Sequence, residues 1–224
     1  MTQTGKRTVL FDLDGTLLRT VEDLAAAVNH ALALHGYPTH PVEKIQRMVG
    51  NGVGLLVARA LPQGFDAPDY DAVLADFREH YSAHCRDATR PYDGVPELLR
   101  ALREQGWRVA VVTNKYQDAS EALMERYFPG LVDAVSGDAP DRRRKPAPDG
   151  VNAALAALGA GRDGAVYVGD TEVDFETAKN AGLPCVCVSW GYRTRAELEE
   201  QGIAPVADTA AELLELLNVF GRCF

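Results

Sequence analysis

Four short apolar runs along the chain predict buried β-strands. They cover residues 8–11 (TVLF), 107–113 (WRVAVVT), 165–169 (AVYVG) and 184–190 (PCVCVSW). Runs without alternation of apolar and polar residues are typical of a parallel sheet whose two faces are both covered. Helical patterns flank the later runs, at residues 95–105, 117–127, 147–158 and 174–181. Strands that alternate with helices predict an α/β fold with a parallel sheet and helices on both faces.

The first run is followed by a long stretch without a convincing strand, from about residue 21 to residue 86. Helical patterns are found there at residues 21–35, 41–49, 53–61 and 70–85. Thr20 and Asp23 resemble a capping box at the start of the first of these helices. We therefore expect an all-helical insert at residues 18–89, within an α/β core formed by residues 1–17 and 90–224.

Composition and charge narrow the class of protein. The 224 residues are 46% hydrophobic and 25% charged, which is ordinary for a globular protein. A net charge of −9 argues against nucleic acid or an anionic membrane as a partner. The N-terminal apolar run is too short for a signal peptide, and no stretch reaches the roughly 18 apolar residues of a membrane helix. The four cysteines form no CxxC motif, which favours reduced thiols and a cytoplasmic location.

Polar side chains follow three of the predicted strands at the point where each strand ends. Asp12 and Asp14 follow the first, Thr113, Asn114 and Lys115 end the second, and Asp170 follows the third, with Asp174 four residues later. Lys145 precedes the helix that leads to the third strand. Ligands of open parallel sheets bind beyond the carboxyl ends of the strands, so these groups converge at one edge. Carboxylate oxygens suit Mg²⁺, whose charge would offset the repulsion between Asp12 and Asp14.

The motifs DLDGT, VVTN, KPAP and GDTEVD, in this order, resemble those of the phosphatase branch of the haloacid dehalogenase superfamily. The resemblance spans roughly the whole chain and implies a Rossmann-like core with a helical cap. The segments VGNGVGLLVARAL and VTNK are similar to those of phosphoglycolate phosphatases. An enzyme of this kind hydrolyses a small phosphorylated metabolite, here expected to be 2-phosphoglycolate, as a monomer or homodimer.

The resemblance also implies a role for each site residue. Asp12 is the nucleophile that forms an aspartyl-phosphate, and Asp14 is the general acid and base. Thr113 and Lys145 hold the phosphoryl oxygens. The expected Mg²⁺ ligands are Asp12, the Asp14 backbone carbonyl, Asp170 and, directly or through a second layer, Asp174. Asn114, Lys115, Asn51 and Gly52 are the expected additional substrate-binding residues.

Several alternatives remain open from the sequence. A sugar-phosphate mutase, a pyrophosphatase and a non-enzymatic phospho-accepting domain share parts of this motif set. A true haloacid dehalogenase lacks the second acid, so Asp14 argues against it. Arg19 stands where the family often has an acidic residue, and it could bind an anionic substrate or point to solvent. Arg142 to Arg144 are further positively charged residues that could attract an anionic substrate. His80 and His84 lie four residues apart, a spacing that can bind a metal ion, but no HExxH pattern accompanies them and we expect them on an exposed helix face.

Overall fold

The computed structural model describes residues 7–50 and 52–220. The chain divides into two compact units. One unit combines Met1–Leu17 with Pro91–Phe224, and the other is formed by Leu18–Arg90. We call the first the α/β unit and the second the helical unit, and we describe each by itself.

The α/β unit contains a six-stranded parallel sheet, in the order β5-β4-β1-β6-β7-β8. The strands are β1 (Thr8–Phe11), β4 (Arg108–Tyr116), β5 (Ala134–Asp138), β6 (Ala165–Gly169), β7 (Cys185–Val188) and β8 (Val206–Ala207). β1 is central and pairs with β4 on one side and with β6 on the other. The predicted α/β class and parallel sheet are confirmed.

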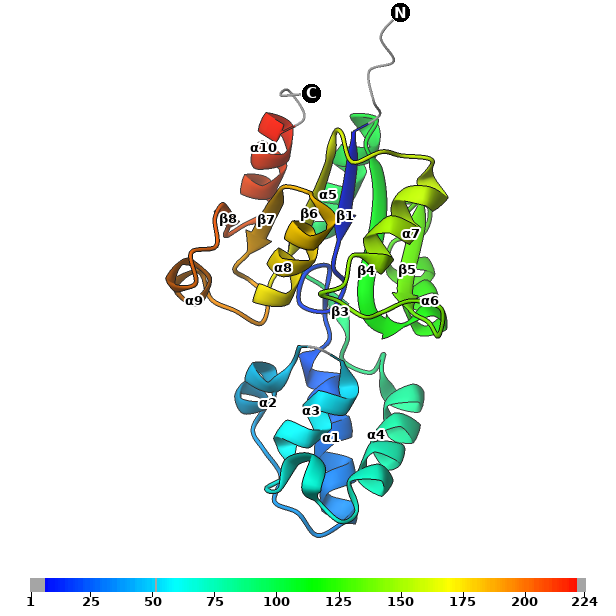
Figure 1. Cartoon of the computed structure of the whole chain (residues 1–224), viewed down its shortest axis with the longest axis vertical. Coiled ribbons are helices and arrows are strands. Elements are labelled where there is room, and N and C mark those ends of the chain that lie inside the picture. Colours follow the sequence, from blue (N-terminus) through cyan, green and yellow to red (C-terminus); the bar gives the residue numbers. More distant parts are fainter. Residues whose placement is uncertain (1–6, 51, 221–224) are drawn as a thin grey trace, which may run out of the picture. The chain divides into compact units, whose positions relative to one another are not determined.

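Helices cover both faces of this sheet. The helices are α5 (Val95–Glu104), α6 (Gln117–Tyr127), α7 (Asp149–Leu158), α8 (Glu172–Ala181), α9 (Arg195–Glu200) and α10 (Ala210–Phe220). Leu10, Val112 and Tyr167 share a buried cluster with residues of α7 and α8. Neighbouring strand residues such as Val9 and Val111 point to the opposite face. There α5 and α10 pack against each other and against the sheet, and Figure 1 shows α5 behind it and α7 and α8 in front.

The sequence patterns missed β5 and β8, together with α9 and α10. In β5, Ser136 and Gly137 interrupt the apolar run AV, so the segment lacks the signature of a buried strand. β8 is only two residues long. β5 and β8 form the two edges of the sheet, and burial in β5 is less complete than in β1.

The helical unit contains α1 (Val21–Leu34), α2 (Val42–Met48), α3 (Val53–Ala60), the short 3₁₀ helix η1 (Gly64–Asp66) and α4 (Tyr70–His84). Its buried core includes Val28 and Leu32 of α1 and Phe77 of α4. The segments β2 (Leu18–Arg19) and β3 (Arg90–Pro91), at the two ends of this unit, pair in a two-stranded sheet. All four α-helices correspond to patterns in the sequence.

The predicted capping box at the start of α1 is wrong. The Thr20 side chain does not cap the helix. The buried Asp23 carboxylate instead accepts hydrogen bonds from the backbone N–H groups of Ala88 and Thr89, at 2.8 and 2.9 Å, and from the Thr89 hydroxyl, at 2.7 Å. Asp23 therefore ties the segment after α4 to the first turn of α1, a long-range role that a local capping pattern cannot reveal.

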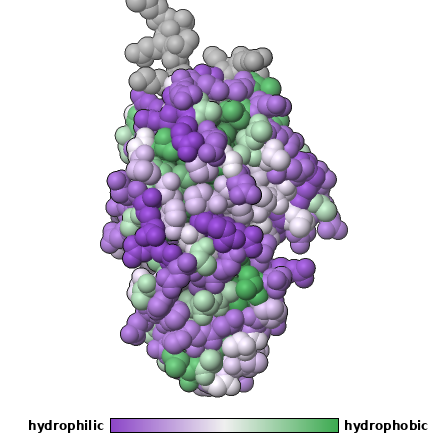
Figure 2. All heavy atoms as spheres, turned by 180° about the vertical axis from the view of Figure 1, so that it is seen from behind, coloured by the Kyte–Doolittle hydropathy of each residue, from purple (hydrophilic) through white to green (hydrophobic). Residues whose placement is uncertain are grey.

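The surface and the thiols agree with the composition. Figure 2 shows a face dominated by hydrophilic residues, with only small apolar spots. Cys85, Cys185 and Cys187 are free thiols, as predicted, and Cys223 lies outside the described residues. None of the helices in the described part of the chain is long and apolar enough to cross a membrane.

Candidate active site

Three acids from different parts of the α/β unit meet at the carboxyl edge of the sheet. Asp12 follows β1, Asp170 follows β6, and Asp174 lies in the first turn of α8. One carboxylate oxygen of each residue lies within 4.8 Å of the others, and all three residues are buried. Such an all-oxygen set is the kind that binds a hard divalent cation.

Lys145 joins two of these acids. Its ammonium nitrogen lies 2.6 Å from Oδ1 of Asp12 and 2.7 Å from Oδ1 of Asp174. Burial acts to lower the pKa of Lys145, but the charges of Asp12 and Asp174 outweigh it and hold that pKa well above its usual value. The lysine is therefore a fixed positive charge at the end of β1.

Burial has the opposite consequence for Asp12. It raises the pKa of Asp12 to about 7, and the nearby Asp174 charge adds to the effect, although Lys145 opposes it. The pKa of Asp170 is likewise held well above its usual range, first by burial and then by the charges of Asp174 and Asp12. Ionising all these acids together is costly, and an additional cation beside them would remove much of that cost.

Asp170 is held by two loops. Its Oδ1 accepts a hydrogen bond from the Thr16 hydroxyl at 2.9 Å, and its Oδ2 accepts one from the backbone N–H of Tyr192 at 2.7 Å. A Cβ at Gly15, whose φ is +92°, or at Gly191 would overlap the Asp170 side chain. Only glycine at these two positions lets the loops approach the carboxylate this closely.

Asp174 is surrounded by donors from the protein. Its Oδ2 accepts hydrogen bonds from the Thr171 hydroxyl at 2.7 Å and from the Thr171 backbone N–H at 3.1 Å. Its Oδ1 accepts from Lys145 and, at 3.4 Å, from the buried Tyr167 hydroxyl. Both oxygens are thus occupied in holding the start of α8 and the lysine.

Asp14 and Lys115 form a second ion pair at the same edge of the sheet. The Lys115 ammonium lies 3.1 Å from Oδ1 and 3.4 Å from Oδ2 of Asp14. The Lys115 side chain is 5% exposed and that of Asp14 is 19% exposed. Thr113, also buried, accepts a hydrogen bond from the Lys115 backbone N–H at 3.2 Å. The Asp14 carboxylate therefore has a defined place and keeps access to solvent.

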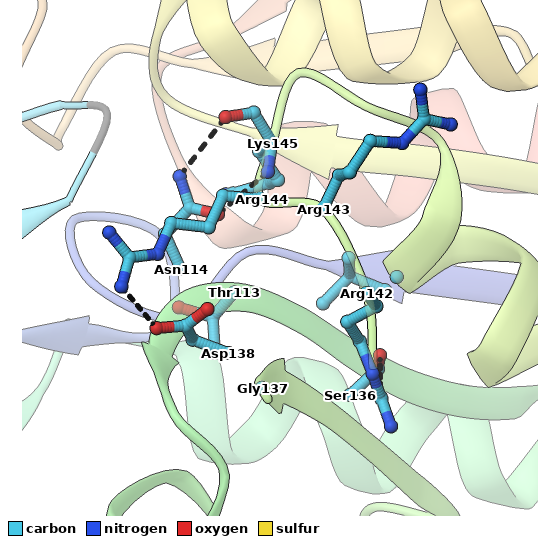
Figure 3. A pocket seen from close by; sticks show the side chains of 11 residues that line it. Thr113, Asn114, Ser136, Gly137, Asp138, Arg142, Arg143, Arg144 and Lys145 are labelled. Atoms are coloured by element: carbon cyan, nitrogen blue, oxygen red, sulfur yellow. Dashed lines mark hydrogen bonds and ion pairs between the residues drawn. The ribbon is translucent and has the colours of Figure 1, made fainter. Parts of the chain in front are cut away.

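The side chain of Asn114 binds the backbone of Lys145. Its Oδ1 accepts a hydrogen bond from the Lys145 N–H at 2.7 Å, and its Nδ2 donates to the Lys145 carbonyl at 3.3 Å. Figure 3 shows the two residues facing each other, with dashed lines between them. This two-point contact fixes the loop that carries the lysine.

Each of the three arginines before Lys145 contacts a polar or acidic side chain of the α/β unit. Arg142 donates to the Ser136 hydroxyl at 2.9 Å, and Arg144 donates to Asp138 at 2.6 Å. Arg143 binds Asp149 through both its backbone and its side chain. Figure 3 shows Arg142 and Arg143 pointing in different directions around a small pocket that Thr113, Asn114 and Gly137 also line. Each guanidinium already has a polar or acidic partner, so the trio is not a set of free cations.

The remaining candidates belong to the helical unit. Arg19 donates to Glu22 at 2.6 Å and is exposed. Gly52 precedes α3, with φ +89°. Asn51 lies outside the described residues.

Sequence reasoning missed Thr16, Tyr167, Gly191 and Tyr192 as supports of the site. Gly191 and Tyr192 follow β7, so the residues beyond that strand end were detectable by the rule that found the others. Tyr167 gave no such signal, because its position inside β6 is that of an ordinary core residue.

Comparison with known proteins defines the class. Residues 9–188 match the family model described as haloacid dehalogenase-like hydrolase. The chain belongs to this family, as its motifs predicted.

The similar proteins with named activities indicate which class of enzyme this hydrolase belongs to. The chain is 38% identical to a phosphoglycolate phosphatase of Cereibacter sphaeroides, over 93% of this chain and 98% of that protein. It is 33% identical to an N-acetylmuramic acid 6-phosphate phosphatase of Pseudomonas aeruginosa, over 95% of each chain. The crystal structure of a putative phosphoglycolate phosphatase from Lactobacillus delbrueckii superposes with a TM-score of 0.91 at 34% identity, covering 95% of this chain and 98% of that one. The enzyme class is therefore that of a phosphatase.

Proposed function

We propose that this phosphatase hydrolyses 2-phosphoglycolate with Mg²⁺ through an aspartyl-phosphate on Asp12. The observation that carries the proposal is the buried meeting of Asp12 with Lys145 and Asp170 beside the Asp14–Lys115 pair. This arrangement places a nucleophile (Asp12), a fixed positive charge (Lys145) and an acid held by another lysine (Asp14) at the carboxyl edge of the sheet.

The donor set fits a magnesium ion. All the available ligands are oxygens, and the raised pKa values of Asp12 and Asp170 reflect crowded negative charge that a cation would relieve. Asp12, the Asp14 carbonyl and Asp170 would hold the ion. When bound, it would neutralise part of the charge of the phosphoryl group. Asp174 stays a candidate ligand, directly or through a second layer, because it belongs to the same buried group of acids, and its Oδ1 also positions Lys145.

The chemistry assigned to the chain has two displacements. An oxygen of Asp12 attacks phosphorus, the ester P–O bond breaks, and Asp14 gives its proton to the departing oxygen. Asp14 then takes a proton from water, and the resulting hydroxide attacks phosphorus, releasing inorganic phosphate and restoring Asp12. Lys145 and the Thr113 hydroxyl bind the transferring oxygens, and Lys115 holds the Asp14 carboxyl in place.

Two relatives named for different substrates provide the candidate substrates for this chain. The Cereibacter relative supports 2-phosphoglycolate, and the Pseudomonas relative is named for a phosphorylated amino sugar. We favour 2-phosphoglycolate because the relatives named for it reach higher identity, up to 39%, and because VTNK and the segment around Gly52 resemble those of phosphoglycolate phosphatases. Asn51 and Gly52 stay predicted substrate contacts, Arg19 stays a candidate cationic group for an anion, and the cytoplasmic location stays a prediction.

A direct comparison of kcat/KM tests the substrate. We expect 2-phosphoglycolate to exceed N-acetylmuramic acid 6-phosphate, pyrophosphate and glucose 6-phosphate by about a hundredfold or more, because an unmade charge-assisted contact costs a few kcal/mol. Preference for another phosphate ester would refute the glycolate assignment and keep the phosphatase. Conversion of a sugar 1-phosphate to its 6-phosphate would instead indicate a mutase.

Metal dependence has its own test. Activity should disappear in excess chelator and return with Mg²⁺. Ca²⁺ should inhibit, because it accepts bidentate carboxylates and would engage the attacking oxygen of Asp12. Full activity in chelator would refute the role of the ion.

A further inference from the structure

The helices α1 and α4 pack against each other in the helical unit (Figure 1). Three histidines gather along this contact. His30 lies on α1, and His80 and His84 lie one turn apart on α4. The ring centroids of His30 and His80 are 4.0 Å apart, and those of His80 and His84 are 4.4 Å apart. The sequence showed only the pair on α4, because fifty residues separate His30 from His80.

The rest of the described structure makes little use of these rings. Neither the His30 ring nor the His80 ring forms a hydrogen bond with another described residue. His84 is different, since its Nδ1 lies 2.8 Å from Oδ2 of Asp87. That carboxylate favours the tautomer with the proton on Nδ1 and leaves the Nε2 lone pair available. A carboxylate behind a histidine is the usual arrangement of a metal ligand.

We propose that His30, His80 and His84 bind a divalent transition-metal ion of the Zn²⁺ class. Two histidines four residues apart on a helix are spaced to bind one ion, and imidazole nitrogens suit Zn²⁺, Ni²⁺ and Cu²⁺. The site differs in chemistry from the all-oxygen cluster of the α/β unit, which suits Mg²⁺. It does not depend on the proposed substrate.

The three rings are stacked, and the structure does not bring one nitrogen from each of them within 4.8 Å of the others. Binding therefore requires the histidine side chains to change their χ1 and χ2 rotamers.

A bound ion would join α1 to α4. Because it would bind the folded helical unit and have no preformed site in the unfolded chain, it would raise the melting temperature with increasing metal concentration.

Calorimetric titration of the full-length protein with Zn²⁺, in saturating Mg²⁺, tests the site. We expect one saturable site whose affinity falls at least tenfold in His84→Ala and about tenfold in Asp87→Asn. His84 is half exposed, so its replacement should leave the fold intact, which circular dichroism checks. His40→Ala, in the same unit but outside the cluster, is the matched control and should leave the affinity unchanged.

A spectroscopic readout separates this site from the acidic cluster. Co²⁺ added to the Mg²⁺-saturated protein should give d–d absorption bands that persist in Asp170→Asn and disappear in His84→Ala. The proposal is overturned if Zn²⁺ shows no saturable binding, if binding survives unchanged in both His84→Ala and His80→Gln, or if it depends on Asp170.

Discussion

Two clusters of charged side chains, one in each unit, differ in whether their charges repel or attract each other. At the acidic edge of the α/β unit, Asp12 and Asp170 are buried beside other carboxylates. In the helical unit, His35 lies between two carboxylates, with Nδ1 3.1 Å from Asp69 and Nε2 2.7 Å from Asp76. The first cluster crowds like charges away from water, and the second matches opposite charges near the surface.

The difference is visible in the pKa directions. Burial raises the pKa of Asp12 and Asp170, which opposes their charged forms. Hydrogen bonds that the His35 ring donates to Asp76 and then to Asp69 raise the pKa of His35, although partial burial opposes them, so there the charged form is favoured. An arrangement that disfavours its own charges is ready to accept a cation or a phosphoryl group, whereas one that satisfies its charges serves the fold. Substitutions in the two clusters should therefore differ in their effects on activity and stability.

Asp12→Asn should have the largest effect, because an amide is a poor nucleophile. We expect kcat to fall at least a thousandfold, about 4 kcal/mol in the barrier. The fold should survive, since the amide keeps the shape of the carboxylate and removes a buried charge. Steady-state kinetics measures the loss, with the exposed Asp163→Asn as the matched control. Retention of more than about a tenth of kcat would refute the nucleophile.

Lys145→Met should reduce both activity and stability. It leaves Asp12 and Asp174 without their shared partner, and breaking a buried ion pair typically costs about 3–5 kcal/mol. Urea unfolding measures this cost, and Lys179→Met, on the exposed face of α8, should be nearly neutral. A loss below about 1 kcal/mol would show that the acids do not depend on this lysine.

Asn114→Ala should have an intermediate effect, because it releases the loop that carries Lys145. We expect kcat/KM to fall about tenfold to a hundredfold, as for the loss of 1–3 kcal/mol from a buried polar contact. Asn114→Asp keeps the acceptor of the 2.7 Å bond and should retain more activity than Asn114→Ala. Equal losses in both variants would argue that the Asn114 amide acts on the substrate and not on the loop.

His35→Gln should have the smallest effect, below about 1 kcal/mol, because its ion pairs are partly exposed. The folded-state pKa of His35 is raised, so the stabilisation is fully present below the unfolded pKa of about 6.5 and is lost as pH rises through the folded value. Thermal melts of wild type and His35→Gln should therefore differ most near pH 6 and converge at higher pH. A difference that grows with pH would contradict this sign.

The amino-acid sequence by itself determined the class of fold and the main chemical groups. Apolar runs without alternation identified β1, β4, β6 and β7, because strands covered on both faces must be apolar throughout. The residues at or after the predicted ends of those strands then pointed to Asp12, Thr113 and Asp170, because parallel strands end at the same edge; in the structure, β4 continues past Thr113 to Tyr116. The edge strand β5 escaped this reasoning, since Ser136 and Gly137 give it no distinctive period.

The tertiary structure decided which groups are partners. Lys115 and Asp14 are 101 residues apart in sequence, and Asp23 and Thr89 are 66 apart, yet both pairs are in direct contact. The structure also made Asn114 a support of Lys145 and added His30 to the two histidines of α4. Local periodicity reports which face of an element is buried. Which side chains meet across that buried face depends on how segments far apart in the sequence pack together. The local pattern of apolar and polar residues does not specify those long-range contacts.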